Sequence, residues 1–374
     1  MTTEENQRKA FKDWFDREAA RGLARQVAAA WPAFPLRRFD RTASEGLEAL
    51  EFQGRVQRFS DALAACLPED VPVALDILTR SLPPELPNCE AVTDGWLQWP
   101  IGQFIADHGV PFLDASMAAM TALTTRFSSE FAIRPFLIER PAETYKRLYA
   151  LTSHPNPHVR RWCSEGTRPR LPWGRRLQAL SRDPSPSWPI LEALKDAPEP
   201  YVRKSVANHL NDIAKDHPDL VIARCCAWLK KAPPGRQWIV RHGLRTLIKQ
   251  GHPEALALLG YAPVEGIKAN LRAAPRNPAI GDSIELKATL RHAGSTACRV
   301  AVDYVVHFAR PSGKTSRRVF KWTTLDLEPG GEVRLAKKHP LRHTTIRTLH
   351  SGRHRIELQV NGLRLANCTF DLRP

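Results

Sequence analysis

Three stretches of the chain repeat one pattern: HPNPHVRRWCSEG from His154, APEPYVRKSVANHLNDIAKDHPD from Ala197 and APPGRQWIVRHGLRTLIKQG from Ala232. Each stretch opens with a proline-containing turn and then starts a helical pattern with an apolar residue followed by a basic one. Aligning the Val-Arg pairs at positions 159/160, 202/203 and 240/241 gives spacings of 43 and 38 residues. Helix pairs with a period of about 40 residues are typical of HEAT-type repeats, in which no unit buries its apolar face alone.

The chain divides into a helical body and a strand-rich tail. Up to about Leu259, apolar residues recur with a 3.6-residue period and proline-containing turns separate the segments. Helices are predicted at 7–30, 54–67, 70–82, 111–126, 130–139, 141–153, 157–167, 172–181, 187–196, 199–215, 217–230, 236–250 and 253–259. After Gly260, alternating β-branched runs predict strands at 283–292, 299–309, 314–327 and 353–362. Hairpin turns are predicted at Ser312 and Gly313, at 329–331, and at Asn361 and Gly362.

About seven strands in about 110 residues is the size of an immunoglobulin-like sandwich, although the Cys…Trp…Cys signature is absent. The predicted fold class is mainly α, with a HEAT-like helical-repeat solenoid over residues 1–260. An all-β immunoglobulin-like sandwich is predicted over residues 265–374. The aromatic residues of the first helices, Trp14, Phe15, Trp31 and Phe34, are expected to pack the core at the end of the array.

The net charge of +16 is unevenly distributed along the chain. Residues 1–140 hold 15 basic and 20 acidic side chains, whereas residues 141–250 and residues 265–374 each hold 20 basic and 9 acidic ones. This distribution favours a polyanionic partner for the second half, most simply nucleic acid, with the acidic N-terminal part facing away from it. The alternative is an arginine-rich composition inherited from a GC-rich genome.

Several other classes of protein do not fit the sequence. No segment approaches the roughly 18 apolar residues that span a membrane, and the N-terminus lacks the features of a secretory signal. The seven cysteines form no Cys-x-x-Cys motif, and prolines inside the His154/His158 and His339/His343 pairs disfavour zinc sites. Phosphate-loop, dinucleotide and nucleophile-elbow motifs are missing. We therefore predict that the protein needs neither a metal nor a cofactor. We also predict a cytoplasmic location and a monomer.

The candidate chemistry lies on the polar faces of the repeats. Arg161, Glu165 and Arg168 share one helix face at i, i+4 and i+7, which is consistent either with a phosphate-binding surface or with a solvated salt-bridge ladder. In the next repeat the positions 202, 206, 210 and 213 form the expected buried stripe, whereas Asn208 and Asp212 lie on another face.

Two acidic positions stand out from the basic background. Glu165 lies at a helix end, one turn before a Gly-Thr-Arg-Pro loop that carries Trp173. An acidic residue in this position, next to arginines and a loop tryptophan, is unfavourable for a purely structural role. Glu130 follows Ser128 and Ser129 near a helix start, so a simple contact with the helix dipole is a serious alternative.

The segments SEFAIRPFL (129–137), HPNPHVRRWCSEGTRPRLPW (154–173), YVRKSVANHLNDIAKDHPDLV (201–221) and WIVRHGLRTLIKQG (238–251) closely resemble the AlkC branch of bacterial alkylpurine DNA glycosylases. The match runs from about Glu130 to Gly260, and the strand-rich tail fits because some AlkC proteins carry an immunoglobulin-like domain. The resemblance implies a base excision repair enzyme that removes cationic lesions such as 3-methyladenine and 3-methylcytosine from duplex DNA. It also implies that the lesion stays stacked, which departs from the usual base-flipping rule.

The resemblance also implies roles for single residues. An N3-alkylated base leaves as a neutral molecule, so the enzyme needs carboxylates that stabilise an oxocarbenium-like sugar and position a water. Glu165 and Asp212 are expected closest to the sugar, Glu130 as an accessory carboxylate, and Trp173 against the deoxyribose or base. DNA contacts are expected from Arg160, Arg161, Arg168, Arg170, Arg203, Lys204, Asn208, Arg241, His242 and Arg245.

The tail is also expected to reach the duplex, through its basic hairpins and the segment 342–355, unless its charge only keeps the sandwich soluble. Two other functions compete with the glycosylase. HEAT repeats more often form binding scaffolds, so a non-catalytic DNA-binding or lesion-sensing protein is the main alternative. An adaptor for acidic proteins explains the charge but not the carboxylates within the basic face.

Overall fold

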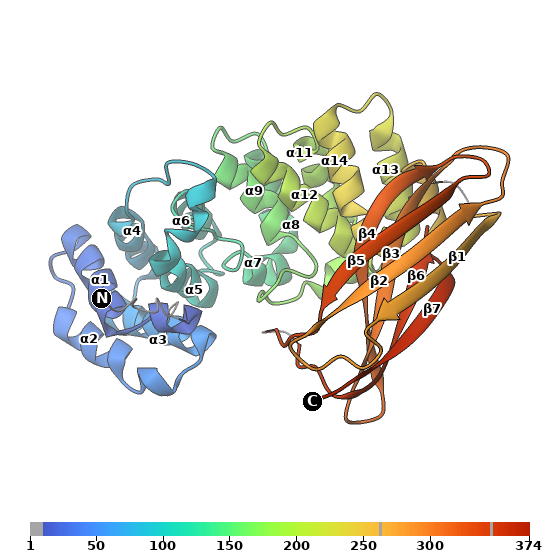
Figure 1. Ribbon diagram of the computed structural model, residues 1–374. Helices are drawn as coiled ribbons and strands as arrows, with labels where there is room; N and C mark the ends of the chain where they lie inside the picture. Colours follow the sequence, from blue (N-terminus) through green and yellow to red (C-terminus); the bar gives the residue numbers. More distant parts are fainter. Residues whose placement is uncertain (1–9, 262–263, 345–346) are drawn as a thin grey trace. The chain divides into compact units, whose positions relative to one another are not determined.

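The computed structural model describes residues 10–261, 264–344 and 347–374 (Figure 1). Within these ranges the chain forms sixteen α-helices followed by seven β-strands. Contacts group the chain into two compact units, Met1–Asp216 with Lys231–Gly243, and His217–Lys230 with Leu244–Pro374. The predicted fold class, a helical-repeat body followed by an immunoglobulin-like sandwich, is confirmed. Whether residues 1–260 and 265–374 fold as separate domains stays a prediction.

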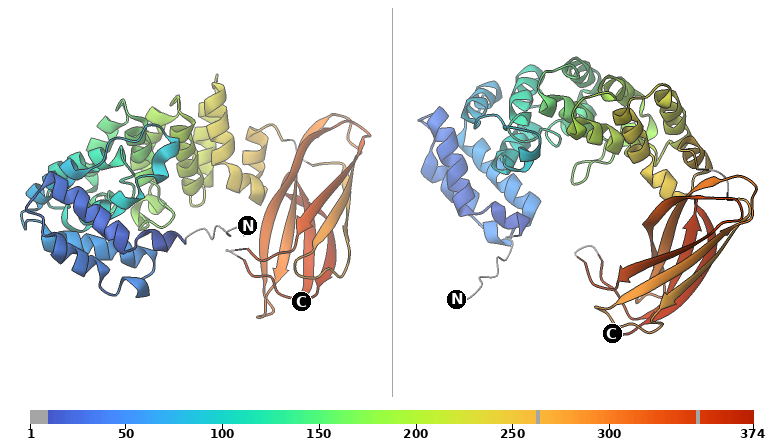
Figure 2. Two further views of the ribbon diagram at one scale, coloured as in Figure 1. Left: turned by 60° about the vertical axis from the view of Figure 1, so that its left-hand side comes forward. Right: turned by 45° about the horizontal axis from the view of Figure 1, so that its top comes forward.

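The first unit is helical, and its helices form an array that advances in chain order (Figure 2). A short 3₁₀ helix, η1 (Phe11–Trp14), precedes them, and another, η4 (Trp96–Gln98), leads into α5. The α-helices of this unit are α1 (Arg17–Ala30), α2 (Leu36–Ser44), α3 (Phe52–Cys66), α4 (Val71–Ser81), α5 (Trp99–His108), α6 (Leu113–Thr124), α7 (Arg134–Glu139), α8 (Pro141–Leu151), α9 (Pro157–Gly166), α10 (Gln178–Arg182), α11 (Trp188–Leu194), α12 (Pro200–Ile213) and α14 (Pro234–Gly243).

The three repeated stretches begin helices α9, α12 and α14, and each helix has proline as its first residue. Proline suits this position because the first N–H of a helix has no intrahelical partner. In α12 the predicted stripe of Val202, Val206, Leu210 and Ile213 is buried. Helix α9 packs against α12, and α12 packs against α14, so successive repeats bury one another's apolar faces.

The structure corrects the alignment of the third repeat. Measured from the first prolines, the repeats start 43 residues apart (157 to 200) and then 34 residues apart (200 to 234). The residue equivalent to Arg160 and Arg203 is therefore Gln237, and Arg241 lies one helical turn later. The Val-Arg alignment was wrong here because a shift of four residues keeps a side chain on nearly the same helix face.

The three equivalent side chains close the turn that precedes their own helix. Arg160 Nη1 donates to the carbonyls of residues 154 and 155, at 2.7 Å each. Arg203 Nη1 donates to those of residues 197 and 198, at 2.7 and 2.6 Å. Gln237 Nε2 donates to the carbonyl of Ala232 at 2.9 Å. The repeated basic residue thus has a structural function in the turn.

Four predicted helices are divided or begin several residues later in the structure, whereas the others differ by a few residues at their ends. The predicted helix 7–30 is divided, because the Asp16 side chain accepts a hydrogen bond from the Ala19 amide and starts α1 there. The predicted helix 236–250 breaks between α14 and α15 (Arg245–Gln250). Those predicted at 130–139 and 172–181 begin later, at α7 and α10. Helices α2 and α5 were not predicted.

The second unit contains α13 (Pro218–Leu229), α15, α16 (Pro253–Leu258) and all seven strands. The strands are β1 (Ile267–Ala274), β2 (Ser283–His292), β3 (Cys298–Ala309), β4 (Thr315–Leu327), β5 (Glu332–Pro340), β6 (Gly352–Val360) and β7 (Leu363–Leu372). They form two antiparallel sheets, ordered β1-β2-β5 and β4-β3-β6-β7. Their inner faces enclose one apolar core, which includes Leu286, Val302 and Ile356.

The predicted turns have mixed outcomes. Asn361 and Gly362 join β6 to its partner β7 with positive φ angles of 42° and 83°, as a two-residue hairpin requires. Gly313 lies at the β3–β4 hairpin with φ 72°. The turn at 329–331 is not a hairpin, because it connects β4 to β5, which belong to different sheets.

Candidate active site

Two of the predicted carboxylates, Glu165 and Asp212, are buried in the first unit and share one arginine. Arg168 Nη1 lies 2.5 Å from Glu165 Oε1, and Arg168 Nε lies 2.9 Å from Asp212 Oδ2. The ammonium of Lys215 lies 2.9 Å from Asp212 Oδ1. These residues come from the end of α9, the loop after it and the end of α12, so the packing of two neighbouring repeats assembles them.

Arg161 extends this cluster to the third carboxylate. Its guanidinium forms an ion pair with Glu130, and its Nη2 lies 3.6 Å from Glu165 Oε1. Two serine hydroxyls fix the carboxylates further: Ser128 donates to Glu130 at 2.8 Å, and Ser205 donates to Glu165 at 2.6 Å. The alternative of a solvated salt-bridge ladder is wrong, because no side chain of the Arg161–Glu165–Arg168 group is more than 16% exposed.

The electrostatics keep Glu165, Arg161 and Arg168 ionised. Burial alone would raise the pKa of Glu165, but Arg161, Arg168 and the Ser205 hydroxyl together hold it below its usual value. Burial would likewise lower the pKa of Arg161 and of Arg168, but their carboxylate partners raise both. Charges that are buried together must be paired. Glu165 is therefore a carboxylate at neutral pH and is unsuited to act as a general acid.

An aromatic recess of about 360 Å³ opens above the charged cluster. Its polar lining consists of Thr93, Ser128, Glu130, Arg161, Glu165 and Arg168. Its aromatic lining consists of Phe11, Trp14, Trp96, Trp99, Phe127, Phe131 and Trp173. Asp212 is not part of the lining and joins the recess through Arg168. The recess therefore combines planar apolar walls with a charged floor.

Trp173 is the most exposed aromatic side chain of the recess, with 65% of its surface accessible. Its φ angle of 63° is left-handed, which costs a residue other than glycine about 1–2 kcal/mol. Its ring centroid lies 5.8 Å from those of Phe11 and Phe52, and 6.4 Å from that of Trp99. The strained backbone presents the indole to solvent at the edge of the recess, a feature that points to function.

The loop that carries Trp173 is held from below by Arg134, a residue that the sequence did not reveal as part of the site. Arg134 is 1% exposed, and its Nη1 donates to the carbonyls of Gly166 and Arg168 at 3.0 Å each. Its Nε donates to the carbonyl of Arg175. One guanidinium thus connects the two ends of the loop and positions Trp173 without lining the recess.

The predicted site residues are only partly gathered. Glu130, Glu165, Trp173, Arg161 and Arg168 line the recess, and Asp212 lies behind Arg168. The other predicted DNA contacts do not line the recess. Arg160 forms an ion pair with Glu199, and Arg170 forms one with Asp216. His242 stacks on Trp238, Lys204 and Arg241 are exposed, and Asn208 is half-buried. Arg245 is the first residue of α15, in the second unit.

The aromatic walls are the main part of the site that sequence reasoning missed. Phe15 and Phe34 are core residues as predicted, but Trp14 and Trp31 are only half-buried, and Trp14 lines the recess. The stretch DGWLQWP at 94–100 supplies Trp96 and Trp99. Two tryptophans three residues apart are the signal that could have indicated an aromatic surface.

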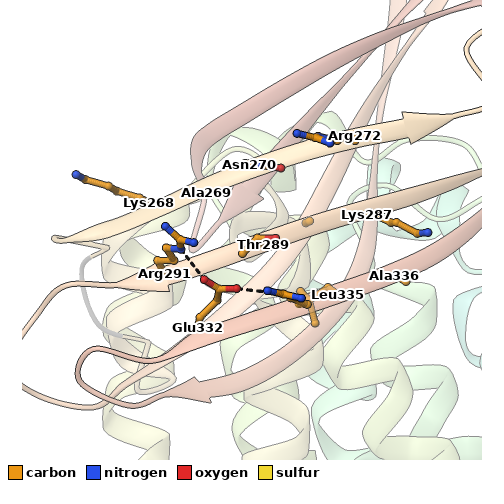
Figure 3. Close-up of a pocket in the computed structure, with 12 residues that line it drawn as sticks. Lys268, Ala269, Asn270, Arg272, Lys287, Thr289, Arg291, Glu332, Leu335 and Ala336 are labelled. Atoms are coloured by element: carbon orange, nitrogen blue, oxygen red, sulfur yellow. Dashed lines mark hydrogen bonds and ion pairs between the residues drawn. The ribbon is translucent and has the colours of Figure 1, made fainter.

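The second unit carries two basic hollows of its own. One, of about 720 Å³, lies on the outer face of the β1-β2-β5 sheet, where Figure 3 shows the side chains of Lys268, Arg272, Lys287 and Arg291. Lys268 faces Arg291 across the sheet, and Arg272 faces Lys287. Like charges directly opposite one another destabilise a sheet. Glu332 offsets part of this charge, with ion pairs to Arg291 at 2.5 Å and to Arg334 at 3.0 Å.

The other hollow, of about 760 Å³, is lined by α15, β3, β4 and the segment before β6. Its basic side chains are Lys249, Arg310, Arg317, Arg318 and Arg347. The guanidinium of Arg347 lies 4.3 Å from the ring centroid of Phe308. The predicted DNA-contacting segment 342–355 contributes to this hollow through residues 347, 348 and 350, whereas residues 345 and 346 lie outside the described part.

Two further searches cover the residues that the structure describes. Within 10–261, 264–344 and 347–374, no three His, Cys, Asp or Glu side chains come together in a way that could hold a metal ion. None of the described helices is both long and apolar enough to cross a membrane.

Comparison with known proteins identifies the family. Residues 268–374 match the family model described as the C-terminal Ig-like domain of the uncharacterised protein YhaZ. The chain is 33% identical to the uncharacterized protein YhaZ of Bacillus subtilis over 353 residues, which cover 94% of this chain and 96% of the relative. It also matches the Pseudomonas fluorescens alkylpurine DNA glycosylase AlkC bound to DNA containing an abasic site analog, with a TM-score of 0.89 and 35% identity, over 98% of this chain and 100% of that one. The resemblance found in the sequence is thereby confirmed, and the chain belongs to the family of the alkylpurine DNA glycosylase AlkC.

Proposed function

We propose that this protein is a DNA glycosylase of base excision repair that hydrolyses the N-glycosidic bond of cationic alkylated bases, such as 3-methyladenine and 3-methylcytosine, in duplex DNA. The observation that carries the proposal is the buried carboxylate cluster beneath the recess beside Trp173. It occurs in a chain that is 35% identical, over nearly its whole length, to an alkylpurine DNA glycosylase.

The chemistry follows from the charge of the lesion. A base alkylated at N3 carries a positive charge, so its bond to the sugar is weakened and it departs as a neutral molecule without protonation. The difficult step is therefore the development of positive charge on the deoxyribose. Carboxylates fixed in a low-dielectric site stabilise such charge more than water does.

The three carboxylates suit this task in different ways. Glu165 is ionised and held on both oxygens, by Arg168 and by Ser205, so it does not need to reorganise during the reaction. Asp212 would contribute a second negative charge, on the other side of the arginine that it shares with Glu165. Glu130 lies at the recess itself and would act as the accessory group that shapes the site or contacts the base edge. Trp173 would pack against the deoxyribose or the cationic base, a contact worth about 0.5–2 kcal/mol.

The proposal includes double-stranded DNA as partner and contact with it by both units. Arg160, Arg161, Arg168, Arg170, Arg203, Lys204, Asn208, Arg241, His242 and Arg245 remain the proposed DNA contacts of the helices. The basic hollows of the second unit support contact by the sandwich, because neither is balanced by an equal number of acids in its lining. We further propose that the lesion stays stacked and that the protein acts as a monomer in the bacterial cytosol. The enzyme would be monofunctional, which means that it hydrolyses the N-glycosidic bond and does not cleave the DNA strand.

Base release from a duplex with one 3-methylcytosine tests this function. The abasic product is cleaved by alkali at the lesion position, so a strand break there reports excision under single-turnover conditions. We expect strand breaks with the alkylated duplex and none with the matched unmodified duplex. A folded protein that binds the duplex in a salt-dependent way but releases neither 3-methylcytosine nor 3-methyladenine would instead be the non-catalytic scaffold.

A further inference from the structure

The two basic hollows of the second unit belong to different faces of the sandwich. The sheet hollow, of about 720 Å³, lies on the outer face of the β1-β2-β5 sheet (Figure 3). The α15 hollow, of about 760 Å³, is lined by α15, β3 and β4. We propose that the sheet hollow binds a second duplex segment, so that one chain holds two segments of DNA at once. The inference rests on the proposed DNA partner and goes beyond the proposed reaction.

The side-chain alternation of the strands places the hollows on opposite sides. On β1, Lys268 and Arg272 line the sheet hollow, whereas Leu271 belongs to the core between the sheets. On β6, Gln359 alternates with core residues and therefore points out of the sandwich on the other side. Its Nε2 donates to the carbonyl of Lys249 at 3.1 Å, so α15 and its hollow lie against this other face.

One duplex segment cannot serve both hollows. The sheets of a sandwich pack about 10 Å apart, so a duplex that touched both outer faces would have to reverse its direction around a thin body. The persistence length of DNA is about 150 base pairs, and a much shorter duplex therefore behaves as a stiff rod. The elastic cost of bending rises with the square of the angle. Two separate segments are the favoured way to occupy both faces.

The sheet hollow has a clear excess of positive charge. Its lining contains the acidic side chain of Glu332 and five basic side chains, those of Lys268, Arg272, Lys287, Arg291 and Arg334. Lysine on an edge strand is a common protection against aggregation. However, Lys287 and Arg291 lie on β2, the central strand of the sheet. Protection of the edges therefore does not explain the charge.

The basic side chains are placed where they repel one another. Lys268 faces Arg291 and Arg272 faces Lys287, an arrangement that destabilises a sheet. The two pairs are four residues apart along their strands, about 13 Å at about 3.3 Å per residue. A duplex carries one phosphate per about 1.7 Å of its axis, or about eight over this length. Phosphates bound between the basic side chains would replace the repulsion by attraction.

The remaining lining favours the backbone of a duplex over other polyanions. Among the described residues that line the sheet hollow, none is aromatic. Sites for single strands stack bases on aromatic side chains, and protein interfaces are enriched in aromatic residues. The row between the two basic pairs holds Asn270 and Thr289, side chains of the kind that contact DNA phosphates. The face thus suits duplex DNA of any sequence.

Sedimentation velocity of the full chain with a fluorescent, unmodified duplex of about 16 base pairs tests the second site. Such a duplex is roughly 54 Å long at 3.4 Å per base pair and is too stiff to follow both faces. At low salt and excess duplex, we expect complexes of one chain with two duplexes. Arg272→Gln/Lys287→Gln should bind one duplex only. Both side chains are exposed and repel each other, so this variant should fold.

Two further variants complete the design. Lys268→Gln/Arg291→Gln removes the other facing pair and should also lose the second duplex. Lys146→Gln/Lys195→Gln is the matched control, because it removes the same charge in the first unit, outside both hollows and the proposed DNA contacts. It should still bind two duplexes.

The outcomes separate this site from the proposed reaction. A wild type that binds no second duplex at duplex concentrations up to about 100 µM would overturn the inference. Two duplexes on a folded variant of either facing pair would also overturn it, and so would complexes of two chains with two duplexes. Excision of 3-methylcytosine or 3-methyladenine by the same wild-type preparation would leave the glycosylase function standing in each case. Two bound duplexes without any excision would support the second site and contradict the reaction.

Discussion

At the scale of single residues, Trp173 combines an exposed indole with a backbone conformation that favours glycine. Removing the side chain should reduce base release, while removing the strain should stabilise the fold. Trp173→Gly and Trp173→Ala both lose the ring, but only glycine adopts a φ of 63° without cost. We expect the Gly variant to be about 1 kcal/mol more stable than the Ala variant in urea unfolding, and both to release base at least about tenfold more slowly. Equal activity of wild type and both variants would exclude a contact of the indole with the substrate.

His209 makes stability depend on pH in a predictable direction. It is completely buried, and burial lowers its pKa from 6.5 to about 4. Between these values the unfolded chain takes up a proton that the folded chain does not, so stability falls as the pH falls below about 6.5. At pH 5 this amounts to about 2 kcal/mol relative to neutral pH.

The measurement is urea unfolding at pH 7 and pH 5 for wild type and His209→Leu. The variant should lose less stability between the two values than wild type does. Parallel losses would show that the imidazole is protonated inside the fold. Glu165 affects stability in a different pH range, because its pKa in the folded protein is lowered below 4.5. Its contribution to the free energy of unfolding is present above pH 4.5 and is lost as the pH falls through the pKa of the folded state.

At the scale of the elements, the repeated arginines have two candidate roles, closing the turn before a helix and contacting a DNA phosphate. The third repeat, which has glutamine at this position, suggests a variant that separates the two roles. Arg203 closes the turn before α12, and Gln237 makes the equivalent bond before α14 without a charge. Arg203→Gln should therefore keep the turn closed and remove only the charge. Arg203→Ala should lose both the hydrogen bonds and the charge.

We expect Arg203→Ala to be about 1–2 kcal/mol less stable than wild type, and Arg203→Gln to be within about 0.5 kcal/mol of it. If Arg203 also contacts a phosphate, both variants should bind duplex DNA more weakly, with a salt slope about one unit smaller. Unchanged DNA affinity in a stable Arg203→Gln variant would limit Arg203 to its role in the turn.

The elements that were predicted well from the sequence are those whose apolar residues lie on one face only. Strand β2 was predicted with the limits that the structure shows, because polar and apolar residues alternate over its first nine positions. Helix α12 has one apolar stripe and one polar face. Helix α5 was missed because its sequence, WPIGQFIADH, contains proline and glycine and is apolar on several sides. Such a segment has no dominant period from which a helix can be recognised.

At the scale of the whole molecule, the charged part of the site was predictable and the aromatic part was not. Glu130, Glu165 and Trp173 lie in the long motifs that carry the resemblance to the AlkC family, and the structure gathers them at one recess. The walls come from positions 11–14, 96–99 and 127–131, which meet only through the packing of α3, α5 and η1. No local pattern encodes such a meeting. The crossover from β4 to β5 was missed for the same reason, because pairing between distant strands decides it.

The most direct test of the account is single-turnover release of 3-methyladenine or 3-methylcytosine from duplex DNA by wild type, Glu165→Gln and Asp212→Asn. Each variant removes one negative charge and keeps the shape of the side chain, and Lys195→Gln, in an i, i+3 pair with Glu192, serves as a charge-changing control. The account predicts release by wild type and the control, and a loss of about 10²-fold or more in at least one carboxylate variant that still binds the duplex. Undiminished release by both folded carboxylate variants would contradict electrostatic catalysis by this cluster.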